Sequence, residues 1–161
     1  MSVSIRKYKI DDVPAMASIW NEVVREGTAF PQIEEMTVDK AAKFFAEQSC
    51  CGVAEEEGTV IGLYILHPNN VGRCSHICNA SFAIASYARG KGAGELLVKH
   101  CLENAAGYGF KILQFNAVVA SNTSAIALYK KLGFTELGTV PGGFLDSNGK
   151  YEDIILFYHR V

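Results

Sequence analysis

The segment ARGKGAGELL, residues 88–97, constrains the fold of this chain more than any other stretch. It holds three glycines within five positions, at Gly90, Gly92 and Gly94. Such a run is too rich in glycine for a strand or a helix interior, because glycine loses the most backbone freedom on folding. A strand-like segment precedes it and an amphipathic segment follows. We therefore expect a turn that joins a strand to the N-terminus of a helix.

A glycine-rich turn at a helix start lets backbone N–H groups approach a phosphate at the positive end of the helix dipole. Arg89 and Lys91 add positive charge and favour an anion. The pattern G-x-G-x-x-G fails because Glu95 or Leu97 stands where the third glycine is required, and G-x-x-x-x-G-K-[ST] has no match. The segment therefore predicts a phosphate-binding loop that follows neither of these two patterns. A tight turn without a ligand is the alternative.

Around this loop the sequence alternates between strand-like and helix-like patterns. Strands are expected at residues 3–9, 75–85, 111–120, 134–142 and 151–161, with two more within 51–66; helices are expected at 11–27, 38–48, 92–109 and 122–133. Asp11 or Asp12 should cap the first helix and Thr37 the second, while Gly27 and Gly133 should end helices. This order predicts an α/β or α+β fold, with a mixed, mostly antiparallel sheet of about seven strands flanked by helices.

Length and charge narrow the classes of protein. A chain of 161 residues is long enough for one core, so we expect a single domain over residues 1–161. Its net charge of −2 offers no basic field for a nucleic acid. The N-terminus lacks a signal-peptide pattern and no segment approaches about 20 apolar residues, so we expect a cytoplasmic protein without a membrane partner.

The cysteines do not indicate a disulfide framework. Their number is odd, at five, and two of them, Cys50 and Cys51, are adjacent. Without a secretion signal, most are expected to be buried thiols. Cys74, His76 and Cys78 lie two apart on one expected strand face. Because a structural zinc site needs four ligands at loop-like spacings, we expect packing rather than a metal or a cysteine nucleophile.

Two motifs at matching separation resemble the GCN5-related N-acetyltransferases. The run Arg89-x-x-Gly92-x-Gly94, five residues after Ile84, resembles the acyl-CoA loop of that family. Asn122 with ALYKKLGF, residues 127–134, is similar to a second family motif, in which Tyr129 occupies a defined position. The order of elements is also similar over nearly the whole chain. The resemblance implies transfer of an acetyl group from acetyl-CoA to an amine, without an acyl-enzyme and without a metal.

The resemblance also implies roles for individual residues. Those implied for the cofactor are Phe82, Ala83, Ile84, Arg89, Gly90, Lys91, Gly92, Ala93, Gly94, Asn122 and Tyr129. Backbone amides of residues 88–94 would hold the CoA pyrophosphate, and the strand before them would pair with the pantetheine arm. Tyr129 matches the tyrosine that returns a proton to the departing thiolate. On periodicity alone, Tyr129 could equally be a core residue of an amphipathic helix.

Asn79 departs from the pattern of the phosphinothricin acetyltransferases, which carry a glutamate at this position. An amide cannot accept a proton at neutral pH, so deprotonation of the amine through water, or binding of a neutral amine, stays open. Asn79 and Asn116 also resemble substrate-binding asparagines of yeast acetyltransferases that act on proline analogues such as azetidine-2-carboxylate. This resemblance implies a small amino or imino acid as acceptor, with Asn79 at the catalytic site. Satisfied buried amides are the alternative.

Three functions therefore compete at this point. The leading one is acetylation of a small-molecule amine. A non-catalytic acyl-CoA-binding sensor would keep the same loop, and an enzyme that acetylates protein N-termini or lysines would use the same cofactor with another acceptor. The acceptor is the expected partner, and a homodimer stays open.

Overall fold

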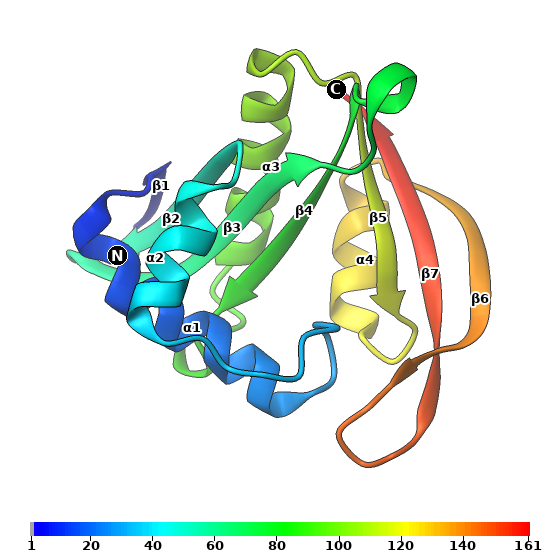
Figure 1. Cartoon of the computed structure of the whole chain (residues 1–161), viewed down its shortest axis with the longest axis horizontal. Coiled ribbons are helices and arrows are strands. Elements are labelled where there is room, and N and C mark those ends of the chain that lie inside the picture. The colour runs from blue at the N-terminus through cyan, green and yellow to red at the C-terminus, as the bar shows by residue number, and fades with distance from the viewer. Residues whose placement is uncertain (1) are drawn as a thin grey trace.

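The computed structural model describes residues 2–161 and contains a seven-stranded mixed sheet with helices on both faces (Figure 1). The strands are β1 Val3–Lys7, β2 Cys50–Glu56, β3 Thr59–Pro68, β4 Ile77–Ile84, β5 Ile112–Val119, β6 Thr135–Leu145 and β7 Tyr151–Arg160, in the order β1-β2-β3-β4-β5-β7-β6. All neighbouring strands are antiparallel except β4 and β5. The predicted fold class is confirmed.

Helices cover the two faces of this sheet. The α-helices are α1 Val13–Glu26, α2 Val38–Ala46, α3 Ala93–Gly107 and α4 Thr123–Lys131, and short 3-10 turns lie at Ile10–Asp12, Gly72–Cys74 and Ser86–Ala88. In Figure 1, α1 and α2 lie in front of the sheet and α3 and α4 behind it. None of the helices in residues 2–161 combines the length and apolarity that a membrane crossing requires.

Most of the expected helix ends are confirmed. Gly27 ends α1 with a φ of 64°, in the left-handed region that glycine adopts readily. Thr37 caps α2 through its hydroxyl, which accepts a hydrogen bond from the Lys40 N–H at 3.2 Å. The expectation for Asp12 is wrong in its detail. Asp12 precedes α1 but its carboxylate caps nothing in that helix; it accepts bonds from Arg6 and from the Lys9 N–H instead.

Apolar side chains fill the space between the sheet and each helix layer. Trp20 of α1 and Phe45 of α2 are buried together, with ring centroids 6.3 Å apart. On the opposite face, Tyr64 is fully buried and its hydroxyl lies 2.9 Å from His100 Nδ1 of α3. Each large buried side chain contributes about 1.5–3 kcal/mol by leaving water. The helices α1 and α3 therefore cover β3 and β4 from opposite faces.

Strands β4 and β5 pair over a very short distance. Only Ile77 with Ile112 and Cys78 with Leu113 are in register. Beyond Cys78, β4 continues to Ile84 with β3 as its neighbour, while β5 continues beside β7. Figure 1 shows the two strands diverging from their common end. This divergence leaves the backbone of residues 79–84 without a strand partner on its β5 side.

The β6–β7 hairpin returns to the end of α1. At its turn, the Ser147 N–H donates to the Gly27 carbonyl at 3.0 Å and the Ser147 hydroxyl donates to the Glu26 carbonyl at 2.9 Å. A Cβ at position 27 would lie 2.5 Å from Ser147 Cβ, so this contact also requires glycine there. The strand β6 runs to Leu145, beyond the expected end at residue 142, because the hairpin is longer than the turn signal indicated.

An ion-pair network joins the first strand to the start of α1. Arg6 donates to both carboxylate oxygens of Asp12, at 2.7 and 3.0 Å, and to Glu55 of β2 at 2.7 Å. The hydrogen bonds from Arg6 hold the pKa of Asp12 below its ordinary value, although partial burial opposes this. The ionised carboxylate therefore stabilises the folded state.

We predict that Asp12→Asn lowers the free energy of unfolding by about 1–3 kcal/mol at neutral pH, because charged hydrogen bonds to Arg6 are lost. A depressed pKa contributes stability above the unfolded-state value of about 3.9, and this stability disappears as the pH falls through the folded-state pKa. Urea unfolding of both proteins at pH 7 and in acid measures the difference. An equal difference at all pH values would contradict the assignment.

Candidate active site

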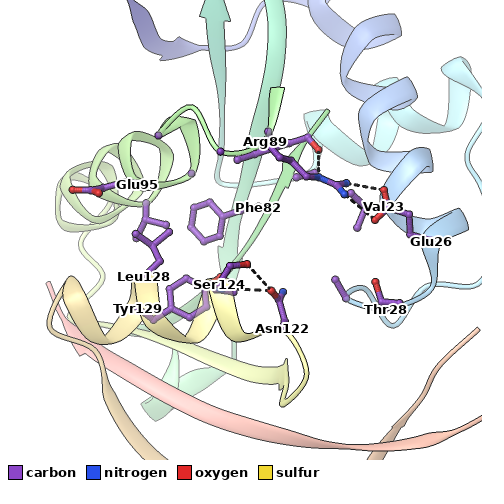
Figure 2. A pocket seen from close by; sticks show the side chains of 18 of the residues that line it. Val23, Glu26, Thr28, Phe82, Arg89, Glu95, Asn122, Ser124, Leu128 and Tyr129 are labelled. Carbon is purple, nitrogen blue, oxygen red and sulfur yellow. Dashed lines mark hydrogen bonds and ion pairs between the residues drawn. The ribbon is translucent and has the colours of Figure 1, made fainter. Parts of the chain in front are cut away.

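A cleft of about 560 Å³ opens where β4 and β5 diverge. Its walls come from the end of α1, the edge of β4, the glycine-rich loop, the first turn of α3 and the start of α4 (Figure 2). Phe82, Ala83 and Ile84 of β4 line it, as expected for the strand before the loop. The cleft therefore brings the loop and the unpaired edge of β4 to one place.

The glycine-rich loop has the geometry that the sequence predicts. Gly90 and Gly92 have φ angles of 81° and 85°, which favour glycine, and a Cβ on either would meet no atom within 4 Å. Gly92 is the residue before α3, and Ala93 and Gly94 begin that helix. The first N–H groups of a helix have no partner within it. The loop thus presents free N–H donors and open space at the positive end of the α3 dipole.

The two cationic side chains of the loop are already paired. Arg89 donates to both carboxylate oxygens of Glu26 at 2.7 and 3.1 Å, as Figure 2 shows, and to the Ile84 carbonyl at 3.2 Å. Lys91 lies 3.2 Å from a carboxylate oxygen of Glu56. These contacts anchor the loop to α1 and β2. Because Arg89 and Lys91 are paired with carboxylates, the backbone N–H groups are the donors that remain available to an anion.

Glu95 is the acidic residue of the first turn of α3. Its carboxylate receives Lys131 of α4 and Lys99 of α3, both at 2.8 Å. Hydrogen bonds from Lys131 and then Lys99 lower the pKa of Glu95 to about 2. The carboxylate is therefore ionised but compensated, and it links α3 to α4 across the cleft.

Tyr129 of α4 lies at the boundary of two cavities, because it lines both this cleft and a second, smaller one. Its ring packs 4.4 Å from Phe115 and 5.4 Å from Phe134, measured between centroids. Burial raises the pKa of Tyr129, with a smaller contribution from Cys101, so the phenol stays protonated at neutral pH. The ring is packed as a core residue would be, and the side chain also borders the open space. Its catalytic role stays a prediction.

Asn122 lies beside Tyr129 in the same boundary. Its side-chain oxygen caps α4 by accepting from the Ala125 N–H at 3.4 Å, and it also accepts from the Ser124 hydroxyl at 3.3 Å (Figure 2). The residue lines both cavities. Asn122 therefore caps a helix, whereas the sequence motif implied only a role in cofactor binding.

The second cavity, of about 330 Å³, is lined by Asn79 and Asn116, the two asparagines expected to bind the substrate. Asn79 is partly buried, and its side-chain oxygen accepts from the Ala80 N–H at 2.8 Å. Asn116 is exposed and forms a reciprocal amide pair with Asn69, at 2.6 and 3.3 Å. Neither side chain is fully buried, although both form hydrogen bonds, so a role in substrate binding stays a prediction. The structure brings them together at one cavity without showing what they bind.

An extra residue in β5 accompanies the position of Asn116. The register between β5 and β7 shifts between Phe115 and Val118, so three steps along β5 match two along β7. Such a bulge bends the strand and re-aims the side chains at that point. Simple alternation along β5 therefore could not have placed Asn116.

Sequence reasoning missed two polar residues of this cavity region. His67, near the end of β3, lines the cavity, and Asn69, in the following loop, holds Asn116. Both lie beyond residue 66, where the sequence pattern predicted the end of the strand. The pairing of β3 with β4 places His67 opposite Asn79. Because β3 extends to Pro68, a longer expected strand would have included His67.

The expected placement of three residues on one strand face is partly wrong. Cys78 lies in β4 and is buried, but Cys74 belongs to a 3-10 turn, and His76 precedes the strand; both are exposed. Because β4 begins at Ile77, Cys74 and His76 lie outside the strand and do not share a strand face with Cys78. Within residues 2–161, no three His, Cys, Asp or Glu side chains gather as metal ligands would.

Comparisons with known proteins agree with this architecture. Residues 16–134 match the model of the acetyltransferase (GNAT) family. N-acetyltransferase aca1 of Schizosaccharomyces pombe is 32% identical over 158 residues, which cover 86% of this chain and 76% of the relative. Phosphinothricin N-acetyltransferase of Alcaligenes faecalis is 28% identical over 161 residues, which cover 95% of this chain and 80% of the relative. A GCN5-related N-acetyltransferase from Kribbella flavida shares the fold with a TM-score of 0.91 and 32% identity, over 99% of this chain and 98% of the other.

The fold and the loop at the diverging strands therefore define a GNAT acyltransferase architecture. The chain belongs to the acetyltransferase (GNAT) family. The enzyme class expected from the sequence, an acetyl-CoA-dependent N-acetyltransferase, is confirmed.

The cysteines differ sharply in their surroundings. Four of the five are buried, namely Cys50, Cys51, Cys78 and Cys101, and Cys74 is exposed. Burial raises the pKa of Cys51 and of Cys78 to about 12. Because the thiolate is the reactive form, these thiols are protected.

We predict that a chromogenic disulfide reagent titrates one thiol rapidly in the native protein and five after denaturation. Cys74→Ser should remove the rapid phase, whereas Cys78→Ser should leave it unchanged. A rapid phase that persists in Cys74→Ser would show that a buried cysteine becomes accessible in the native state.

Proposed function

We propose that this enzyme transfers the acetyl group of acetyl-CoA to the nitrogen of a small amino or imino acid. The observation that carries the proposal is the meeting of two cavities at Tyr129, one bordered by the glycine-rich loop and one bordered by amides. The second cavity, at about 330 Å³, suits a small acceptor better than a folded protein chain.

The residues of the first cleft fit acetyl-CoA. Gly90 and Gly92 leave open space beside free N–H groups, which suits a pyrophosphate. The edge of β4 at residues 79–84 lacks a strand partner on one side, which suits an extended amide-bearing arm. When bound, acetyl-CoA supplies an activated acetyl thioester. The protein's contribution is to hold it in place, and to offer the neutral Tyr129 hydroxyl as a proton donor to the leaving sulfur.

The amides of the second cavity suit a carboxylate. Asn79 and Asn116 each carry an NH₂ group with two donors, and only one donor of Asn116 is used by Asn69. No acidic side chain lines this cavity among the described residues. An anionic substrate group would therefore meet hydrogen-bond donors and no negative charge. A glutamate at position 79 would repel it. The similarity to an enzyme named for phosphinothricin supports a small-molecule acceptor.

We predict that Gly92→Val weakens acetyl-CoA binding at least tenfold in a folded protein, because the side chain enters the space beside the loop donors. Gly58→Val is the matched control. Gly58 also has a positive φ, 78°, with no atom within 4 Å of its Cβ, but it lies in the β2–β3 turn and lines neither cavity. Calorimetry on both variants separates loss of the site from backbone strain. Unchanged affinity in Gly92→Val would reject the loop.

The acceptor is tested by an ordering of activities. Amino and imino acids should be acetylated faster than their amides or decarboxylated amines, and Asn79→Ala should lower kcat/KM for the acids about ten- to hundredfold. The control is Asn104→Ala, because Asn104 is partly buried near the end of α3 and lines neither cavity. A thiol-release assay over both acceptor series measures the order. Faster turnover of polyamines would refute carboxylate recognition, and faster turnover of peptide N-termini would favour a protein acceptor.

A further inference from the structure

We infer that His67 accepts the proton which the acceptor amine must lose before it attacks. This inference rests on the proposed function and deepens it. Asn79 lines the second cavity, and its amide cannot take a proton. The ionisable side chains among the described residues that line the second cavity are His67 and Tyr129. One base and one acid are what the reaction needs.

The sheet register brings His67 beside the acceptor site. His67 of β3 is directly opposite Asn79 of β4 in the antiparallel pair. Side chains of directly opposed residues project from the same face of a sheet, with Cβ atoms about 5 Å apart. His67 and Asn79 therefore border the same cavity from adjacent strands, and the side chain of His67 is partly buried there.

A hydrogen bond fixes which nitrogen of His67 can accept a proton. Nδ1 lies 3.0 Å from the Pro68 carbonyl oxygen. A carbonyl can only accept, so Nδ1 carries the hydrogen and Nε2 carries the lone pair. No hydrogen bond joins Nε2 to another residue within 2–161. This hydrogen bond favours the tautomer whose Nε2 lone pair a base at this cavity requires.

The surroundings of Tyr129 assign it the role of proton donor. Burial raises the pKa of Tyr129, which keeps its proton at neutral pH and makes it the donor. Among residues 2–161, no aspartate, glutamate, lysine or arginine lines the second cavity, so Tyr129 is the titratable side chain that shares it with His67. An imidazole with a free Nε2 lone pair can accept a proton.

The protons balance with these two groups. A protonated amine loses two protons in becoming an amide. His67 Nε2 takes the first, so that the nitrogen lone pair can form its bond to the acetyl carbon. As the carbon–sulfur bond breaks, the sulfur takes the hydroxyl proton of Tyr129, and Tyr129 regains one when the new amide nitrogen sheds its second proton. The proton on His67 then passes to solvent as the net proton of the reaction.

The test compares His67→Gln with the wild type from about one pH unit below neutral to about three units above it, roughly pH 6 to 10. We expect kcat/KM near pH 7 to fall about 100-fold, with acetyl-CoA affinity unchanged by calorimetry. The deficit should shrink at high pH, because more of the acceptor amine is neutral in solution. Added imidazole should restore part of the activity of His67→Gly. His76→Gln is the matched control, because His76 is exposed and lines neither cavity.

Two results would overturn the inference. One is a folded His67→Gln protein with wild-type kcat/KM and pH profile. The other is a loss that is equal at every pH and is not relieved by imidazole, which would make His67 a positioning residue only. Both require a wild-type protein that acetylates a small amine. Failure of the wild type with all small amines would instead refute the proposed function itself.

Discussion

The early end of pairing between β4 and β5 is the constraint on which the site depends. Two residue pairs join these parallel strands, and beyond them each strand keeps only its outer neighbour. A sheet normally satisfies its backbone donors and acceptors internally. Here one edge is opened inside the sheet, and helices α3 and α4 flank the opening from one face (Figure 1). Both cavities occur at this opening, so the position of the chemistry follows from a single interruption in a hydrogen-bond ladder.

Backbone dipoles provide the net positive potential at the glycine-rich loop, because the charged side chains around the cleft neutralise one another. Arg89 is paired with Glu26, Lys91 with Glu56, and Glu95 with two lysines. What remains unpaired at the loop is the set of N–H groups at the start of α3, supported by the helix dipole. Donors of this kind are held by the backbone and need little reorganisation when an anion arrives. The side chains thus shape the loop and the backbone faces the ligand.

Local patterns were sufficient to predict the order of elements, the caps at Thr37 and Gly27, and the turn before α3, because each depends on residues close in sequence. The predictions that failed depend on partners in other elements. Asp12 bonds to Arg6 rather than to its own helix, and the apparent strand face at Cys74 and His76 ended where pairing with β3 ended. The placement of Asn116 depends on a bulge set by β7. His67 joined the site only through its register with Asn79, which no single segment encodes.

The contact between the last hairpin and the first long helix has a wider meaning for this enzyme. Ser147 holds the backbone of Glu26 and Gly27, and the Glu26 side chain holds Arg89 of the loop. The hairpin lines neither cavity, yet it is two contacts away from the loop. Energetic linkage is reciprocal, so a ligand that orders the loop and a change in the hairpin that shifts Glu26 would act on the same contact. Sequence change at a remote surface turn can in this way tune cofactor affinity while leaving every lining residue intact.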